Sequence, residues 1–256
     1  MTARQPPERD VAPVVQRLRI RYAKRGPLRF SSHRDFQRAL ERALRRARVP
    51  MAYSAGFSPH PRVSYANAAP TGAASEAEYV EIGVVRECDA DAVRAQLDAA
   101  LPPGLDVLDV VVARTPDLVA RLAASRWRID VPGVTVAELA EAWQAVLGAA
   151  EAPVQRMMKQ GLRTIDIRPA LLAGGVLPVA GRVSATSWST LELTVANVTP
   201  TVRPEEVLVA LREIGWLQVG DPARATRLAQ GPLGEGGAVG DPLAPDRPSL
   251  QSIPTG

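Results

Sequence analysis

The fold of this chain is decided in the stretch from Phe30 to Gly72, FSSHRDFQRALERALRRARVPMAYSAGFSPHPRVSYANAAPTG. Ser32 and Asp35 have the spacing of a capping box, which predicts the start of a helix. Apolar residues then recur at helical spacing and predict one buried stripe, formed by Phe36, Leu40, Ala43, Leu44 and Ala47. Pro50 is expected to stop this helix.

The other faces of the predicted helix carry arginines, namely Arg34, Arg38, Arg42, Arg45, Arg46 and Arg48. Glu41 is the local acid that could pair with them. Like charges without partners repel, so such a cluster is tolerated more easily when a polyanion or an acidic protein meets it. We expect this helix to bind RNA, DNA or an acidic protein; the alternative is a merely solvated face.

The charge of the chain is concentrated around this helix. The net charge is +4, but residues 15–62 hold thirteen Lys or Arg and two acids, so the rest of the chain is net acidic. That asymmetry predicts a negatively charged partner for the N-terminal third.

Residues 54–62, SAGFSPHPR, form a loop whose two prolines fix φ and whose glycine permits a sharp bend. We expect a pre-shaped ridge on which Phe57 stacks on a base and Ser58 contacts RNA. A purely structural proline-rich turn is the alternative.

Both histidines of the chain, His33 and His60, lie in this stretch. As metal ligands they would need a third donor, and only Asp35 is near in sequence, so no metal site is predicted. They could act as base and acid, or as hydrogen-bonding posts that fix the loop. We expect no catalytic residues but a polar cluster, consisting of Ser32, His33, Asp35, His60 and Arg62.

The strand predicted before this stretch, residues 16–30, alternates between apolar residues and Arg17, Arg19 and Arg21. A turn at residues 24–27 divides it, and residues 28–30 are expected to return as a strand. The face that bears the three arginines is expected to be either solvated or a polyanion-binding surface.

The remaining elements predict an α+β fold with two tandem ferredoxin-like (βαββαβ) domains. The first spans residues 14–115, with strands at 62–66, 78–85 and 105–113 and a second helix at 90–101. The second spans residues 120–229, with strands at 126–131, 161–168, 187–196 and 223–228 and helices at 135–147 and 204–214. Residues 1–13 are expected to be flexible, and the Gly- and Pro-rich residues 230–256 to be a disordered tail.

The single cysteine, Cys88, excludes an internal disulfide and an iron–sulfur cluster held by this chain alone. The first thirty residues lack an apolar signal core, and no run is long enough to span a membrane. These features predict a cytoplasmic protein.

Three motifs resemble a bacterial protein family described as radical-SAM-associated or radical-SAM-linked. They are the Ser-His-x-Asp helix start at residues 32–35, the Gly-Phe-Ser-Pro-His-Pro loop at residues 56–61 and the Ser-Glu-Ala-Glu-Tyr segment at residues 75–79. In some bacteria the similar domain is fused behind a cobalamin-type radical-SAM enzyme. In others it stands beside the gene of such an enzyme and near a ribonuclease of the E/G type.

The resemblance implies that the chain works with a radical-SAM enzyme. That partner would carry the iron–sulfur cluster and SAM and, in the cobalamin type, cobalamin; this chain would need no cofactor. We therefore expect a non-catalytic accessory protein that presents a substrate or binds RNA. The alternatives are an RNA-cleaving or other hydrolytic enzyme that uses His33 and His60, and a protein-interaction module that docks on the radical-SAM enzyme.

Overall fold

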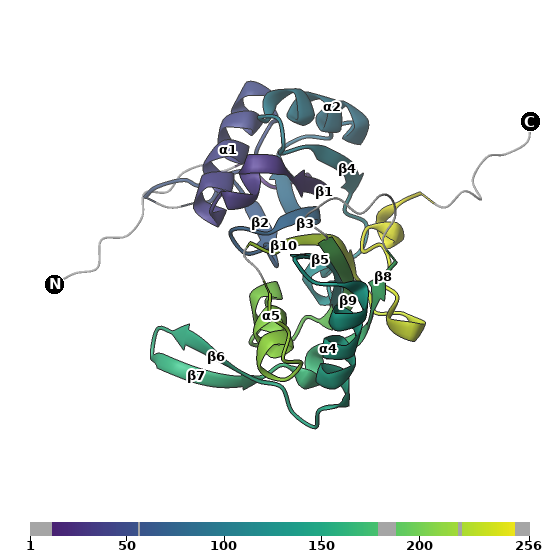
Figure 1. Cartoon of the computed structure of the whole chain (residues 1–256). Coiled ribbons are helices and arrows are strands. Elements are labelled where there is room, and N and C mark those ends of the chain that lie inside the picture. The colour runs from purple at the N-terminus through teal and green to yellow at the C-terminus, as the bar shows by residue number, and fades with distance from the viewer. Residues whose placement is uncertain (1–11, 56, 179–187, 220–221, 249–256) are drawn as a thin grey trace, which may run out of the picture. The chain divides into compact units, whose positions relative to one another are not determined.

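The computed structural model describes residues 12–55, 57–178, 188–219 and 222–248. The predicted flexible N-terminus falls largely on residues 1–11, outside the described residues. The chain is a mixed α+β protein that divides into two compact units. Unit 1 comprises residues 1–71, 76–119 and 243–256, and unit 2 comprises residues 72–75 and 120–242. Figure 1 labels the elements of both units.

Unit 1 contains the elements in the predicted order strand, helix, strand, strand, helix, strand. These are β1 (Gln16–Lys24), α1 (His33–Arg46), β2 (Val63–Ala66), β3 (Ala74–Val84), α2 (Ala90–Ala100) and β4 (Val107–Val112). The strand order is β4-β1-β3, and β2 pairs antiparallel with β3. Both helices pack on the same core, to which the strands contribute Leu18, Ile20, Val80 and Ile82 and the helices contribute Phe36, Leu40 and Leu97.

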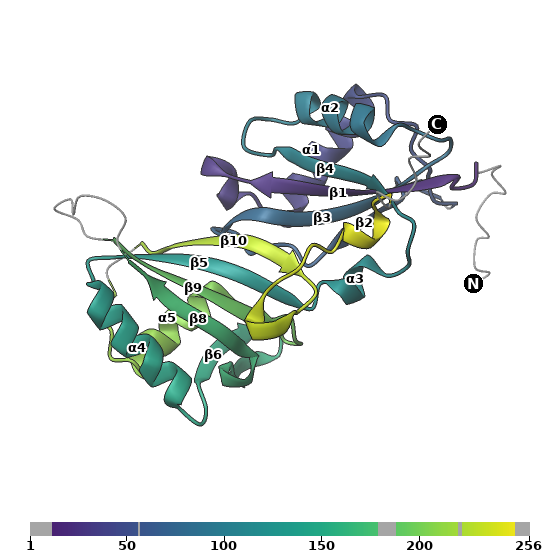
Figure 2. The same cartoon turned by 90° about the vertical axis from the view of Figure 1, so that its right-hand side faces the viewer.

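Unit 2 holds a four-stranded sheet with the order β10-β5-β9-β8. Its strands are β5 (Ala124–Pro132), β8 (Leu171–Leu177), β9 (Trp188–Ala196) and β10 (Arg224–Gly231), and its longer helices are α4 (Val136–Gly148) and α5 (Pro204–Glu213). The β10 strand also pairs in parallel with Ala74 and Ser75, the first residues of β3, which belong to this unit. Figure 2 shows α4 along one face of these strands, where Trp143 is fully buried. A four-residue helix, α3 (Leu118–Arg121), precedes β5.

One predicted strand is wrong, and another is confirmed but pairs outside the main sheet of its unit. Residues 28–30 do not return as a strand, because residues Gly26–Phe30 form a 3-10 helix with Pro27 in its first turn. The strand predicted at 161–168 is present as β7 (Gly161–Asp166), which pairs with β6 (Pro153–Met158) in a separate two-stranded sheet. The second strand of the unit 2 sheet is instead β8, which the sequence did not predict.

The predicted disordered tail is wrong for residues 230–248. Gln230 and Gly231 end β10, and two short 3-10 helices follow at Glu235–Gly237 and Ala244–Asp246. Asp246 is buried in unit 1. The carboxylate of Asp246 forms an ion pair with Arg19 and so holds this segment against unit 1. A high content of glycine and proline therefore does not indicate disorder here. Residues 249–256 lie outside the described part of the chain.

The prediction that the arginines of β1 face solvent or a polyanion is wrong for Arg19, whereas the side chain of Arg17 is 54% exposed. Arg19 is only 2% exposed, and its guanidinium donates to Glu81 Oε2 at 2.9 Å and to Asp246 Oδ2 at 2.6 Å. Arg17 pairs with the other oxygen of Glu81 at 3.1 Å. Arg21 donates from Nε to the carbonyl oxygen of Glu76 at 2.9 Å. These three side chains are occupied within unit 1.

Candidate functional site

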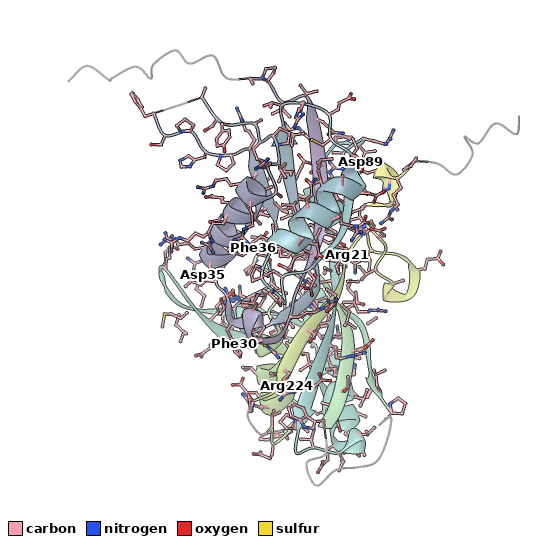
Figure 3. All side chains as sticks on the ribbon, turned by 90° about the horizontal axis from the view of Figure 1, so that it is seen from above. Arg21, Phe30, Asp35, Phe36, Asp89 and Arg224 are labelled. Carbon is pink, nitrogen blue, oxygen red and sulfur yellow. The ribbon has the colours of Figure 1, made fainter. Side chains whose placement is uncertain are left out.

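Helix α1 begins with the capping box that the sequence predicts. Ser32 Oγ accepts from the amide of Asp35 at 3.2 Å, and Asp35 Oδ2 accepts from the amide and the hydroxyl of Ser32 at 3.2 and 2.6 Å. Figure 3 places Asp35 and Phe36 in the first turn of this helix. The hydrogen bonds from Ser32 lower the pKa of Asp35, and the charges of Arg38 and Arg34 add to this. Both capping residues therefore serve the fold, and they orient the helix that carries the arginines.

The six arginines of α1 and its C-terminal turn are exposed, namely Arg34, Arg38, Arg42, Arg45, Arg46 and Arg48. Arg45 Nη2 lies 3.6 Å from Glu41 Oε2, and Arg46 Nη1 donates to the carbonyl oxygen of Ala100 at 3.0 Å. Among the described residues, Arg34, Arg38 and Arg42 have no hydrogen-bond acceptor or ion pair for their guanidinium groups. Asp35 is an acid close enough to Arg38 and Arg34 for their charges to act on its carboxylate.

The ring of His33 packs against an aromatic cluster at the start of α1. Its ring meets that of Tyr65 edge-on, with centroids 4.9 Å apart, and Nε2 lies 3.0 Å from the side-chain nitrogen of Gln37. Phe36 packs edge-on against Tyr65 and stacks on Tyr22. Burial raises the pKa of Tyr65 to about 12, with a smaller contribution from the charge of Glu41. Tyr65 is thus a neutral hydroxyl donor near neutral pH.

The loop that carries His60 is closed by its own hydrogen bonds. The amide of Ser54 donates to the carbonyl oxygen of His60 at 2.9 Å, and the amide of His60 donates to Ser54 Oγ at 3.0 Å. Arg62 leaves the loop with its amide bonded to the carbonyl oxygen of Ala52. Between these closures Phe57 is 54% exposed, and Ser58 beside it is exposed as well. The loop therefore presents an aromatic ring, as the sequence predicts.

A pocket of about 280 Å³ joins this loop to α1. Helix α1 contributes three of its lining residues, Glu41, Leu44 and Arg45. The segments around the loop supply the others, Val49, Met51, Tyr53, Pro59, His60 and Pro61. Arg45 of the basic helix and His60 of the loop therefore line the same pocket.

The residues of the predicted polar cluster have different observed partners. His60 lines the pocket, whereas His33 does not, and the partners of His33 are Gln37 and Tyr65. Ser32 and Asp35 bond to each other. Within the described residues no group of three or more histidine, cysteine or acidic side chains is placed to hold a metal ion. Nor does any described helix have the length and apolarity needed to cross a membrane.

Three residues of the site were missed from the sequence: Glu41, Tyr53 and Tyr65. The sequence indicates Glu41 as an ion-pair partner for arginines, and the structure shows that it also lines the pocket. Tyr53 forms an isolated bridge with Pro61 across the base of the loop, which no local pattern signals. Tyr65 meets α1 because β2 pairs with β3 and both strands pack on the helix.

A family model described as "Uncharacterized protein conserved in bacteria (DUF2344)" matches residues 17–204. The chain belongs to this family. The match includes α1, the loop and every residue that lines the pocket. No curated protein matches the chain.

Among solved structures, the chain is similar to the crystal structure of an unknown protein from Galdieria sulphuraria. The two are 13% identical, the similarity covers 83% of this chain and 98% of that one, and the TM-score is 0.24. This likeness is too weak to carry an argument about fold or function.

Proposed function

We propose that this protein is a non-catalytic accessory protein that binds single-stranded RNA and presents it to a radical-SAM enzyme. The RNA would lie along the arginines of α1 and over the loop that contains Phe57 and His60. The observation that carries this proposal is that the arginine-rich helix α1 and the loop are adjacent and line one pocket. Exposed guanidinium groups that have no partner in the described part of the chain lie on the same helix that forms one wall of the loop pocket.

The state of the arginines favours a polyanion over a merely solvated surface. Elsewhere in unit 1 the chain supplies acids for its arginines, as Glu81 and Asp246 do for Arg19. For Arg38 and Arg42 it supplies no such partner among the described residues. Phosphates that are neutralised by such groups release counterions, which favours binding.

The aromatic groups favour a single strand over a duplex. Phe57 is exposed in the loop, and Tyr53 is exposed at the pocket. Unstacked bases of single-stranded RNA pack on such rings, and each stack contributes about 1–3 kcal/mol. Paired bases of a duplex would not offer their faces to these side chains.

The radical-SAM partner rests on the sequence resemblance alone. Such enzymes hold their cluster with cysteine thiolates, and this chain has one cysteine. The cluster, SAM and, in the cobalamin type, cobalamin would therefore belong to the partner. The alternative in which this chain cleaves RNA with His33 and His60 is less well supported, since the two rings have different neighbours.

The same strand orders support a finer assignment of the fold. We infer that both units are ferredoxin-like, with the hairpin β6–β7 inserted in the second. In support, β4-β1-β3 with β2 on β3, and β10-β5-β9-β8, each follow the sequence β-α-β-β-α-β once that hairpin is set aside.

The test of RNA binding is fluorescence anisotropy with a labelled single-stranded RNA of mixed sequence, titrated at salt concentrations from about 50 to about 200 mM. Binding through several phosphates should weaken steeply as salt rises. Weak binding that is insensitive to salt would exclude RNA. Pull-down of the radical-SAM enzyme in the presence of nuclease separates the remaining alternative, because a protein-docking module keeps its partner when RNA is removed.

A further inference from the structure

We infer that the pocket between α1 and the loop selects a guanine base. This inference rests on the proposed RNA binding and deepens it, because it assigns a base preference to one position of the bound strand. The pocket has a volume of about 280 Å³, just below the range of about 300–1,000 Å³ that is usual for drug-sized ligands. A single heterocyclic base is a fitting occupant for a space of this size.

The walls of the pocket suit a flat ring. Its floor is apolar, because the side chains of Leu44, Val49 and Met51 belong to the core of unit 1. Tyr53 and His60 line the opening with aromatic rings, and two loop prolines lie beside them. Aromatic and proline side chains pack on the faces of a base and leave its edge free for hydrogen bonds.

The rim of the pocket carries a specific pattern of hydrogen-bond groups. The carboxylate of Glu41 is an acceptor at both oxygens, and the guanidinium of Arg45 is a donor only. The two groups are 3.6 Å apart, so they present one donor next to two acceptors. The side chains of Glu41 and Arg45 are 39% and 70% exposed, and such an exposed ion pair is weak, so a ligand can take its place.

Guanine is the base whose edge complements this pattern. Its Watson–Crick edge offers the acceptor O6 next to two donors, N1–H and the N2 amino group. Arg45 would donate to O6, and the two oxygens of Glu41 would accept from N1–H and N2. Adenine and cytosine each place an acceptor beside their amino group, and uracil flanks one N–H with two acceptors. None of these three can donate twice to one carboxylate.

A guanine site explains why a carboxylate, that of Glu41, lies in the middle of an arginine-rich helix. A site for phosphate alone would gain from losing Glu41, since its negative charge repels an anion. A site that reads a donor edge requires it. The acid therefore gives base selectivity at the expense of some general affinity.

The test compares short oligouridine RNAs that differ only at one central position, which is uridine, guanosine, adenosine or inosine. Inosine retains O6 and N1–H but lacks the N2 amino group. We expect the guanosine RNA to bind roughly tenfold more tightly than the all-uridine RNA. The inosine RNA should bind with intermediate affinity, and the adenosine RNA should bind like the all-uridine RNA.

The decisive variant is Glu41→Gln, with Glu87→Gln as its control. Both replacements remove one negative charge from unit 1, but Glu87 is exposed outside the pocket. We expect Glu41→Gln to abolish the guanosine preference and to leave binding of the all-uridine RNA equal or slightly tighter. The Glu87→Gln variant should retain the full preference. A preference that persists in Glu41→Gln would overturn the inference.

The outcomes separate this inference from the proposed function. Equal, salt-sensitive binding of all four RNAs would overturn the guanine site and leave RNA binding intact. Absence of binding to every RNA would overturn both. Guanosine monophosphate is titrated in parallel against the same protein. If it binds as tightly as the guanosine RNA, and Glu41→Gln removes that binding, the pocket is a site for the free nucleotide and its assignment to bound RNA is overturned.

Discussion

Two elements of unit 1 are rich in arginine, and they use this residue in opposite ways. On β1, Arg19 is buried between Glu81 and Asp246, and Arg17 shares Glu81 with it. On α1, Arg38 and Arg42 are exposed, and no described acid pairs with them. The first set stabilises the fold, and the second is available to a partner.

The difference teaches that a basic stretch of sequence cannot be treated as one surface. Arg17, Arg19 and the α1 arginines all lie within residues 15–62. They differ in role because some of them meet acids from distant parts of the chain. Asp246, for example, is 227 positions from Arg19. The positive charge that remains for a partner is the part that the fold does not neutralise.

The largest effect should come from breaking the buried pair of β1. Asp246→Ala leaves Glu81 as the acid that faces the buried guanidinium of Arg19, beside the carbonyl oxygen of Thr115, and it removes the acceptor of the Thr115 hydroxyl. Loss of one member of a buried pair costs about 3–5 kcal/mol, so we expect the free energy of unfolding to fall by that amount. Chemical denaturation measures it. Arg247→Ala removes a more exposed ion pair with Asp109 and should cost less than about 1 kcal/mol; an equal loss in both variants would contradict the account.

The same carboxylate should make the protein sensitive to acid. Burial by itself raises the pKa of Asp246, but hydrogen bonds from Thr115 and Arg19 outweigh it and hold this pKa well below the usual range. A depressed pKa stabilises the fold above the unfolded value of about 3.9, and this stabilisation is lost as the pH falls below it.

We therefore expect the wild-type protein to lose more stability than Asp246→Asn when the pH is lowered from about 7 to about 3. Urea denaturation at several pH values gives the two curves. If the free energy of unfolding falls equally in both proteins as the pH is lowered, Asp246 is not a charged partner of Arg19.

On α1 the expected effect is on binding rather than on stability. Arg42→Glu should weaken binding of single-stranded RNA roughly tenfold, because a phosphate contact is replaced by a repulsion. Its free energy of unfolding should change by no more than about 0.5 kcal/mol, since the side chain is exposed. Arg86→Glu makes the same charge change at an exposed position of unit 1 outside α1. If both variants weaken binding equally, overall charge and not the helix governs binding.

The smallest effect should come from the cap that starts α1. Ser32→Ala removes the acceptor of the Asp35 amide and a donor to its carboxylate, at a cost of about 1 kcal/mol in the free energy of unfolding. Ser31→Ala, one position earlier, is the control, because the Ser31 side chain makes no hydrogen bond to any residue that the structure describes. Thermal or chemical denaturation compares them. Equal free energies of unfolding for the two variants would show that the cap does not stabilise the fold.

Features that depend on neighbouring residues could be predicted from the sequence. The capping boxes at Ser32 and Thr135 lie where their spacing predicts them, because both partners fall within three residues. The apolar stripe of α1 is buried through Phe36, Leu40 and Leu44 as expected. The element order of unit 1 follows from the same local periodicities.

Features that depend on distant residues could not be predicted. Strand β8 contains Gly174 and Gly175, which give a weak strand signal. The structure requires Gly174, since a Cβ there would lie 2.8 Å from Trp143 and 2.9 Å from the carbonyl oxygen of Glu192. In the candidate site, the approach of Glu41 and Arg45 to His60 depends on how the loop folds back on α1. No spacing in the sequence encodes that contact.

The central claim is that the α1 arginines are the part of the basic stretch that meets phosphates. Its most direct test is the salt dependence of RNA affinity for the wild-type protein and for a variant with Arg38→Gln and Arg42→Gln. Each lost contact with a single strand reduces the slope of log K against log salt by about 0.7, so the account predicts a slope that is shallower by roughly 1.4. An unchanged slope would contradict the claim.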